Sequence, residues 1–135
     1  MPLGTEDRTT ITERLSMHGH VFGAGELDRL DDLFTADVVY DISDFGQEPL
    51  VGIAANREAS IALGPANPVA HQITNIVLTE LDDGRVRALS KGIGVNANGT
   101  SGSVTYEDTV VPGAAEGGAP TVVRCARRGP LGGKY

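Results

Sequence analysis

The sequence contains no tryptophan, one cysteine and three histidines among its 135 residues. The single cysteine, Cys125, has no partner for an internal disulfide and cannot build a thiolate metal site alone, so we interpret it as a small buried apolar residue. The histidines lack the spacing of metal ligands. Gly92 and Gly94 lie in an expected strand with no helix after it, which excludes a dinucleotide-binding loop. We therefore expect neither a metal nor a cofactor.

Positive charge is also scarce, because 11 Lys and Arg stand against 18 Asp and Glu and the net charge is −7. Nucleic-acid binding needs clustered cations, and the basic cluster Arg124, Arg127 and Arg128 is typical of a solvated strand end. No apolar run reaches the roughly 18 residues of a membrane span. Residues 1–8 are polar and lack the apolar stretch of a signal peptide. We expect a cytoplasmic protein that binds neither nucleic acid nor membrane.

The hydropathy pattern divides the chain into a mainly helical first half and a second half of strands. Helices are predicted at 7–23, 26–34 and 51–63, and a short strand at 37–45. Further strands are predicted at 70–80, 85–96, 102–111 and 121–128, with turns at Asp83-Gly84 and Asn98-Gly99. The length fits one domain over 1–135, with an ordered core at about 7–128.

This order of elements predicts an α+β fold. Consecutive strands joined by tight turns form an antiparallel sheet. Helices gathered in one half of the chain must cover one face of that sheet. We therefore predict a cone-shaped, curved antiparallel sheet closed by three helices, with one ligand-sized pocket between the helices and the concave face.

His18 is the most informative residue, because it shares the apolar stripe of the first helix with Ile11, Leu15 and Phe22. In the predicted fold this stripe faces the pocket, so His18 would be catalytic and Phe22 would contact the substrate. A structural histidine in the core is the alternative. His20 lies far round the helix from His18 and should face solvent.

The first predicted strand places Tyr40, Ile42 and Asp44 on one face, if it stays regular that far. We expect Tyr40 and Ile42 in the wall of the pocket. Asp44 could be a general base whose pKa is raised by an apolar environment. It could equally cap the turn before Gly46.

The later strands add two pairs of candidates. His71 and Asn75 are four residues apart, so a regular strand puts both on one face, where they could move a proton or orient a carbonyl. The alternative is the outer face, at a dimer contact. Tyr106 and Asp108 also share a face, with Tyr106 against the substrate. Asp108 could donate a hydrogen bond if protonated, or form an ion pair with an arginine of the last strand.

Residues 24–41 carry a family resemblance, since Gly-Glu-Leu-Asp is followed by Leu-Phe-Thr-Ala-Asp and a short strand. This pattern resembles the SnoaL-like polyketide cyclases of the nuclear-transport-factor-2-like superfamily, whose fold is a cystatin-like roll. The segment 46–52, the His71-x-x-x-Asn75 strand and Tyr106-x-Asp108 are similar too, so the resemblance covers residues 10–128.

Ketosteroid isomerases and scytalone dehydratases belong to the same superfamily, and comparison with the isomerases implies roles for single residues. Their oxyanion-binding tyrosine falls on His18, and their second hydrogen-bonding aspartate falls on Asp108. Their catalytic base falls on Ile42 or Ser43, neither of which is a carboxylate, with Asp44 as a near neighbour.

The resemblance implies a cofactor-independent acid–base enzyme, a cyclase, dehydratase or isomerase acting on a hydrophobic polyketide-like intermediate of secondary metabolism. Asp44 or His71 would remove the proton, while His18 and Asp108 would stabilise the oxygen that gains charge. One alternative is epoxide opening on the same scaffold, and another is a non-catalytic ligand-binding or dimerisation module. The resemblance also implies a homodimer formed through the outer face of the sheet.

Overall fold

The computed structural model describes residues 3–34, 36–43, 46–111 and 121–128. Its helices are α1 (Thr5–Gly23), α2 (Leu30–Leu33) and α3 (Ile53–Leu63), with the short 3₁₀ helices η1 (Leu27–Arg29) and η3 (Gly64–Ala66). Its strands are β1 (Val39–Asp41), β2 (Leu50–Val51), β3 (Ala70–Glu80), β4 (Val86–Val95), β5 (Ser101–Val111) and β6 (Thr121–Arg128). Among the helices of the described residues, none has the length and apolar character needed to cross a bilayer.

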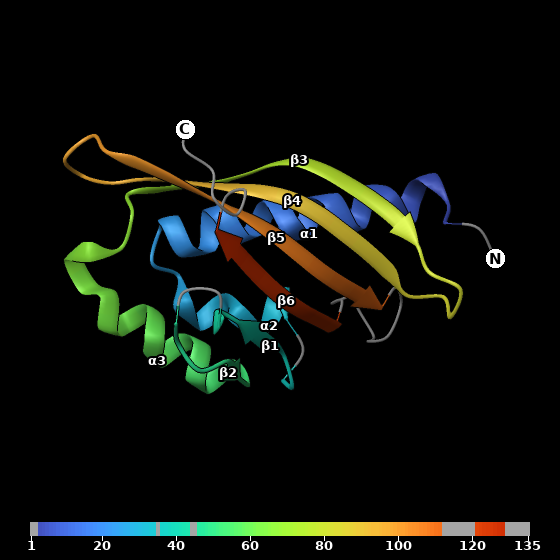
Figure 1. The fold of residues 1–135 in the computed structure, drawn as a ribbon, viewed down its shortest axis with the longest axis horizontal. Coiled ribbons are helices and arrows are strands. Elements are labelled where there is room, and N and C mark those ends of the chain that lie inside the picture. Colours follow the sequence, from blue (N-terminus) through green and yellow to red (C-terminus); the bar gives the residue numbers. More distant parts are fainter. Residues whose placement is uncertain (1–2, 35, 44–45, 112–120, 129–135) are drawn as a thin grey trace.

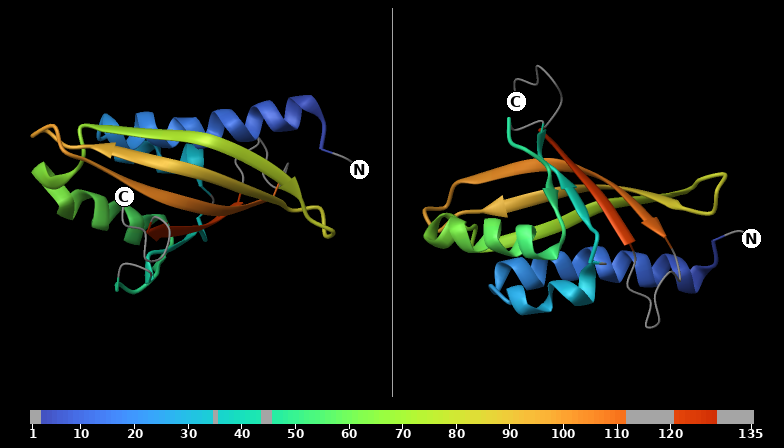
Figure 2. Two further views of the ribbon diagram at one scale, coloured as in Figure 1. Left: turned by 45° about the horizontal axis from the view of Figure 1, so that its top comes forward. Right: turned by 90° about the horizontal axis from the view of Figure 1, so that it is seen from below.

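The strands form one sheet in the order β2-β1-β6-β5-β4-β3. The four long strands β3 to β6 are antiparallel neighbours along the chain, as predicted. Figures 1 and 2 show the curvature of this sheet and the position of α1 along one of its faces, with α2 beside the C-terminal half of α1 and α3 near the end of that helix. The predicted α+β architecture, with helices over one face of a curved sheet, is confirmed.

The helix α1 forms where apolar residues recur every three or four positions, which gives it one buried side. The buried residues of α1 are Ile11, Leu15, His18 and Val21. Glu6 and Asp7 lie in its first turn, where carboxylates interact favourably with the free N–H groups. The helix begins at Thr5, slightly before the predicted start, and the Arg8 N–H already donates to the Gly4 carbonyl.

The strand β4 separates the core from the outer face by simple alternation. Val86, Ala88 and Ser90 are buried, whereas Arg87 and Leu89 between them are exposed. The core cluster joins α1, the η1–α2 segment, β4 and β5, and its members are Ile11, Leu15, Val21, Leu30, Leu33, Phe34, Val38, Val86, Ala88 and Val110. The core therefore fills the space next to the Val86 end of β4, and the other end of the helix–sheet interface is left for a cavity.

Local structure between residues 26 and 51 differs from the prediction. The expected helix at 26–34 is divided into η1 and the four-residue α2, and within the described part of the expected strand at 37–45 the strand covers Val39–Asp41. The two-residue β2 was not predicted, and β1 runs parallel to β6, not antiparallel. β1 is held by partners on both sides, so its extent depends on pairing with distant residues and not on its own periodicity.

Candidate functional site

A cavity of about 220 Å³ lies between the C-terminal half of α1, the β1 region, α3, β3 and β5. Its apolar lining includes Phe22, Phe34, Ile42, Leu50 and Leu63. Its titratable lining side chains are His18, Tyr40, His71 and Tyr106. Within the described part of the chain, no Asp, Glu, Lys or Arg lines this cavity. Among the described residues, the lining groups available for proton transfer are therefore imidazoles and phenols.

His18 lies on the inner side of α1 and is 5% exposed, whereas His20 is exposed, as the helical spacing predicts. The His18 ring packs on Phe22 one turn later, with centroids 4.4 Å apart and planes inclined by 31°. On the sheet side its centroid is 5.7 Å from that of Tyr106. The imidazole is thus held between two aromatic rings at the wall of the cavity.

Tyr106 reaches this position because its neighbour on β4 is a glycine. Gly92 lies diagonally across from Tyr106, which pairs directly with Ser90. A Cβ atom at Gly92 would overlap the edge of the tyrosine ring and would lie 3.1 Å from both Tyr106 Cζ and Val104 Cγ2. The ring therefore lies over the space that a β4 side chain would occupy, between His18 and Tyr40. Its centroid is 6.5 Å from that of Tyr40.

His71, near the start of β3, lines the same cavity, with its ring centroid 6.3 Å from that of His18. Its Nε2 is 3.1 Å from Asn67 Oδ1. The Asn67 Nδ2 in turn donates to the carbonyl of Phe22 at 3.1 Å. Burial lowers the pKa of the His71 imidazole below its ordinary value of 6.5, although a hydrogen bond with the Pro68 backbone opposes part of this effect. Burial thus favours the neutral, basic form of His71.

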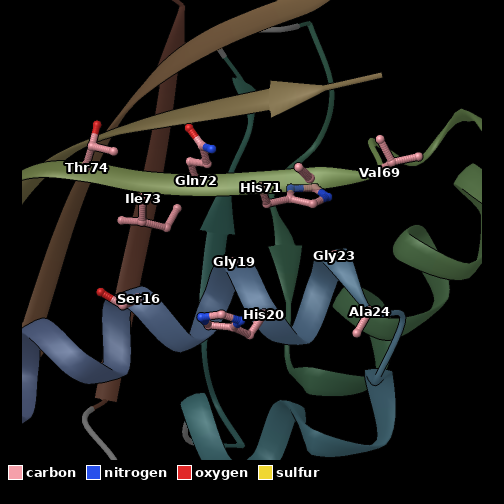
Figure 3. A pocket seen from close by; sticks show the side chains of 11 residues that line it. Ser16, Gly19, His20, Gly23, Ala24, Val69, His71, Gln72, Ile73 and Thr74 are labelled. Carbon is pink, nitrogen blue, oxygen red and sulfur yellow. The ribbon is translucent and has the colours of Figure 1, made fainter. Parts of the chain in front are cut away.

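The close approach of β3 to α1 depends on two glycines of the helix, Gly19 and Gly23, which face β3 in Figure 3. A Cβ atom at Gly19 would overlap the backbone carbonyl oxygen of His71 and would lie 3.3 Å from its carbon. A Cβ atom at Gly23 would make ordinary contacts of 3.9 Å with His71. Gly19 is therefore the position that permits α1 and β3 to touch at the backbone.

A second hollow, of about 630 Å³, follows the outside of this contact and is the one drawn in Figure 3. It is an open groove between α1 and the free edge of β3, lined by residues that include Ser16, His20 and Gln72. Of the predicted site residues that the structure describes, His71 alone lines it. Although this groove is larger, the predicted aromatic and imidazole groups meet in the smaller cavity, which we take as the candidate site.

The sequence-predicted residues divide into three groups. His18, Phe22, Tyr40, Ile42, His71 and Tyr106 all line the cavity. Asp44 lies outside the described residues. Asn75 and Asp108 are described but are not among the lining residues.

Asn75 is exposed, so its predicted place in the pocket is wrong. The β3–β4 register shifts between Thr74 and Val77, and Asn75 at this bulge has a positive φ of 55°. A bulge breaks the two-residue alternation of a strand. Asn75 and Val77 consequently do not share the inner face with His71 and Ile73.

Asp108 is fully buried on the inner face of β5, two residues from Tyr106 and directly opposite Arg124 in the β5–β6 register. It belongs to the packed region next to Ala88, with which it pairs on β4. The predicted direct contact between Asp108 and a ligand therefore has no support from the shape of the cavity.

Sequence reasoning missed the amide groups of the cavity. Gln47, Asn56 and Asn67 all line it, and Asn56 is buried with its Nδ2 donating to the Gly52 carbonyl at 2.8 Å. Asn67 precedes Pro68 just before β3, which is a typical turn sequence. That context gave no indication of its contact with Phe22, 45 residues earlier.

The described residues contain no group of three or more His, Cys, Asp or Glu side chains that could hold a metal ion.

Comparison with solved structures identifies the fold. A candidate aromatic ring hydroxylase from Novosphingobium aromaticivorans is similar, with 27% identity over 94% of this chain and 92% of that one, and a TM-score of 0.73. An NTF2-like protein with a cystatin-like fold from the same organism shows 22% identity over 91% and 82% of the two chains, with a TM-score of 0.71. The predicted cystatin-like roll is confirmed.

A third similar structure, from Catenulispora acidiphila, was determined in complex with S-DNPA. It shows 21% identity over 88% of this chain and 92% of that one, with a TM-score of 0.68.

A search of curated protein sequences found no match. The family model described as SnoaL-like domain matches residues 4–118, which is most of the sequence. On this match, together with the cone-shaped fold and its aromatic cavity, the chain belongs to the SnoaL-like domain family.

Proposed function

We propose that this protein is a cofactor-independent acid–base enzyme, a cyclase, dehydratase or isomerase, that acts on a small hydrophobic polyketide-like ligand. The observation that carries the proposal is the convergence of two imidazoles and a phenol on one largely apolar cavity. The ring centroid of His18 is 5.7 Å from that of Tyr106 and 6.3 Å from that of His71. Membership of the SnoaL-like family and the S-DNPA complex of a structural neighbour support a small-molecule ligand.

In the proposed reaction, His71 is the general base. Its neutral ring accepts a proton from a carbon next to a ligand carbonyl, and the electron pair of the broken C–H bond moves onto the carbonyl oxygen. If a second double bond is conjugated with the carbonyl, the resulting dienolate can take the proton back at its far carbon, which isomerises the ligand. Alternatively the enolate can attack a second carbonyl of the same molecule, which closes a ring and leaves an alkoxide that takes the proton. The His71 imidazolium returns the proton, so no other reactant is needed. General base catalysis of this kind contributes about 10²- to 10⁴-fold.

Donors for the charged oxygen are also proposed from the cavity wall. His18 can donate from a ring N–H, and Tyr106 and Tyr40 can donate from their hydroxyl groups. All three lie on rigid elements and are packed against other rings, so they would need little reorganisation during the reaction. A preorganised donor of this kind is worth about 10²- to 10³-fold in rate.

The size of the cavity sets the size of the reacting part of the ligand. A dry protein cavity of about 150 Å³ is large enough to bind benzene. By that measure the present cavity, at about 220 Å³, encloses one substituted ring or two fused rings. A larger polyketide would extend past the rim, where Leu63 is partly exposed.

A carbon-acid exchange assay tests the proposal without knowledge of the natural substrate. The probe is 1-tetralone, a two-ring ketone, whose hydrogens next to the carbonyl exchange with solvent deuterium when a base removes them. Exchange is followed by ¹H NMR in D₂O buffer for the wild type, His71→Gln and His18→Ala. We expect each substitution to slow the protein-catalysed exchange at least tenfold.

His20→Gln is the matched control, because His20 lies on the same helix but is exposed and outside the cavity. Asp44→Asn tests the second base predicted from the sequence. Equal rates for the wild type and His71→Gln would overturn the assignment of His71 as base. Binding of tetralone without any acceleration of exchange would favour a non-catalytic binding module.

We also propose that the chain forms a homodimer through the outer face of the sheet. Val77 and Leu89 pair across β3 and β4 on this face and are 56% and 41% exposed. Sedimentation velocity of the wild type and of Leu89→Lys tests this proposal. We expect a dimer that the lysine converts to a monomer, and a wild type that is monomeric at tens of micromolar would contradict it.

A further inference from the structure

Asn67 occupies a bridging position between α1 and β3. It lies in the short connection from η3 (Gly64–Ala66) to β3 and is half-buried at the cavity. Its side-chain amide makes two hydrogen bonds of 3.1 Å, one with the Phe22 carbonyl and one with His71 Nε2. One of these partners is the proposed base itself, and the other belongs to a residue next to it, because the ring centroids of Phe22 and His71 are 6.2 Å apart.

The chemistry of these two partners fixes the orientation of the amide. The Phe22 carbonyl is an acceptor only, so it must face the NH₂ end of Asn67. The carbonyl end, Oδ1, then faces His71 Nε2. Because Oδ1 is itself an acceptor only, a hydrogen bond at this contact requires the proton to be on Nε2.

We propose that Asn67 is a positioning residue that holds neutral His71 as the Nε2–H tautomer and leaves Nδ1 as its basic nitrogen. The role of Nδ1 in proton transfer rests on the proposed function of His71. The tautomer itself does not, because it rests on the contact of Nε2 with Asn67 Oδ1. The backbone carbonyl of Pro68 is a second acceptor for this ring, so the measured position of the proton decides between the two acceptors.

An amide suits this position better than a carboxylate would. The Nε2–H···Oδ1 bond can persist when Nδ1 gains a proton, so the ring can accept and return a proton without rotating. A carboxylate at the same place would hold a negative charge about 3 Å from the ring and would favour the imidazolium. That charge would oppose the effect of burial, which lowers the pKa of His71. Among the described residues, the other titratable groups around the ring are His18, Tyr40 and Tyr106 in the cavity and His20 in the groove outside.

The test is a measurement of the imidazole ¹⁵N chemical shifts of His71 by NMR as a function of pH, on the full chain. In the neutral wild-type protein we expect Nε2 to be protonated and Nδ1 to be unprotonated, with little averaging between the two. In Asn67→Leu we expect the two shifts to move toward each other, as in a side chain that exchanges between tautomers. A neutral wild-type ring with its proton on Nδ1 would overturn the proposal. This outcome is measured on the wild type alone, so it does not depend on the folding of a variant.

The second arm compares Asn67→Asp with Asn75→Asp, which adds the same charge at the exposed bulge of β3. We expect Asn67→Asp to raise the titration midpoint of His71 by at least one pH unit, and Asn75→Asp to leave it nearly unchanged. Equal midpoints in the two variants would overturn the proposal. If His71→Gln leaves tetralone exchange unchanged while the wild-type tautomer is Nε2–H, the proposed base is wrong and the assignment of Asn67 stands.

Discussion

Gly19→Ala tests whether the backbone contact between α1 and β3 is essential for this fold. The new methyl group would overlap the carbonyl oxygen of His71, which is a backbone atom held by the β3–β4 pairing. A flexible side chain could rotate away from such an overlap, but a paired strand cannot. The helix and the strand must therefore separate, and His71 must move with the strand.

Two opposing effects determine the sign of the change in stability. Replacing glycine by alanine inside a helix stabilises it by about 1 kcal/mol. Overpacking that forces a backbone shift costs about 1–3 kcal/mol, and contact with a rigid backbone atom places the cost near the upper end. We therefore expect Gly19→Ala to reduce the free energy of unfolding by about 2 kcal/mol. Gly23→Ala, whose Cβ would make only 3.9 Å contacts, should be neutral or slightly stabilising.

Chemical denaturation of both variants measures this difference, and thermal unfolding provides a check. For a chain of this length a difference of about 2–3 kcal/mol between the variants corresponds to on the order of 5–10 °C in Tm. Gly23→Ala controls for the general effect of alanine on α1. A Gly19→Ala protein as stable as Gly23→Ala would refute the reasoning, because it would show that a methyl group fits between α1 and β3 without loss of stability.

Three further predictions concern the interior of the sheet and the proposed base. Gly92→Ala should push the Tyr106 ring out of its place, destabilise the fold by about 1–3 kcal/mol and weaken tetralone binding, as measured by denaturation and by NMR titration. Ser90→Ala should leave the free energy of unfolding unchanged or raise it by about 1 kcal/mol. Its Oγ is buried without a hydrogen-bond partner among the described residues, and a clear loss of stability in denaturation would reveal a partner. The lowered pKa of His71 means that the unfolded chain binds protons more readily than the folded one. The stabilisation from neutral His71 should thus be complete well above pH 6.5 and be lost as the pH falls through 6.5 toward the folded-state pKa, a loss absent from His71→Gln.

The parts of the fold that were predictable from the sequence are those set by local signals. The strand β3 has the predicted bounds of 70–80, between Pro68 and the Asp83-Gly84 turn. The inner side of α1 follows from the spacing of Ile11, Leu15 and His18. The bounds of β3 are thus set by the residues that flank it, and the inner side of α1 is set by the periodicity of the helix.

The features that were missed depend on contacts between distant parts of the chain. The parallel pairing of β1 with β6 joins Val39 to Val123, and no local pattern records it. Asn75 does not lie on the predicted inner face because a bulge interrupts an otherwise regular strand. Asn67 bonds to a helix carbonyl that the sequence cannot place next to it. An interruption of one residue is enough to reverse a face, so strand alternation alone could not have separated Asn75 from His71.

The proposed use of imidazoles as acid–base groups in this cavity has a physical basis in the way burial acts on acids and bases. Burial favours the neutral form of any titratable group. For a carboxyl group the neutral form is the acid, so an apolar cavity reduces the fraction present as the basic carboxylate near neutral pH, although it makes that carboxylate a stronger base. For an imidazole the neutral form is the base, and the same burial keeps His71 ready to accept a proton. By the resemblance to ketosteroid isomerases, their catalytic base falls on Ile42 or Ser43, and Ile42 lines the same cavity as His71. Ile42 is thus part of the largely apolar lining of the cavity that the proposed base His71 also lines.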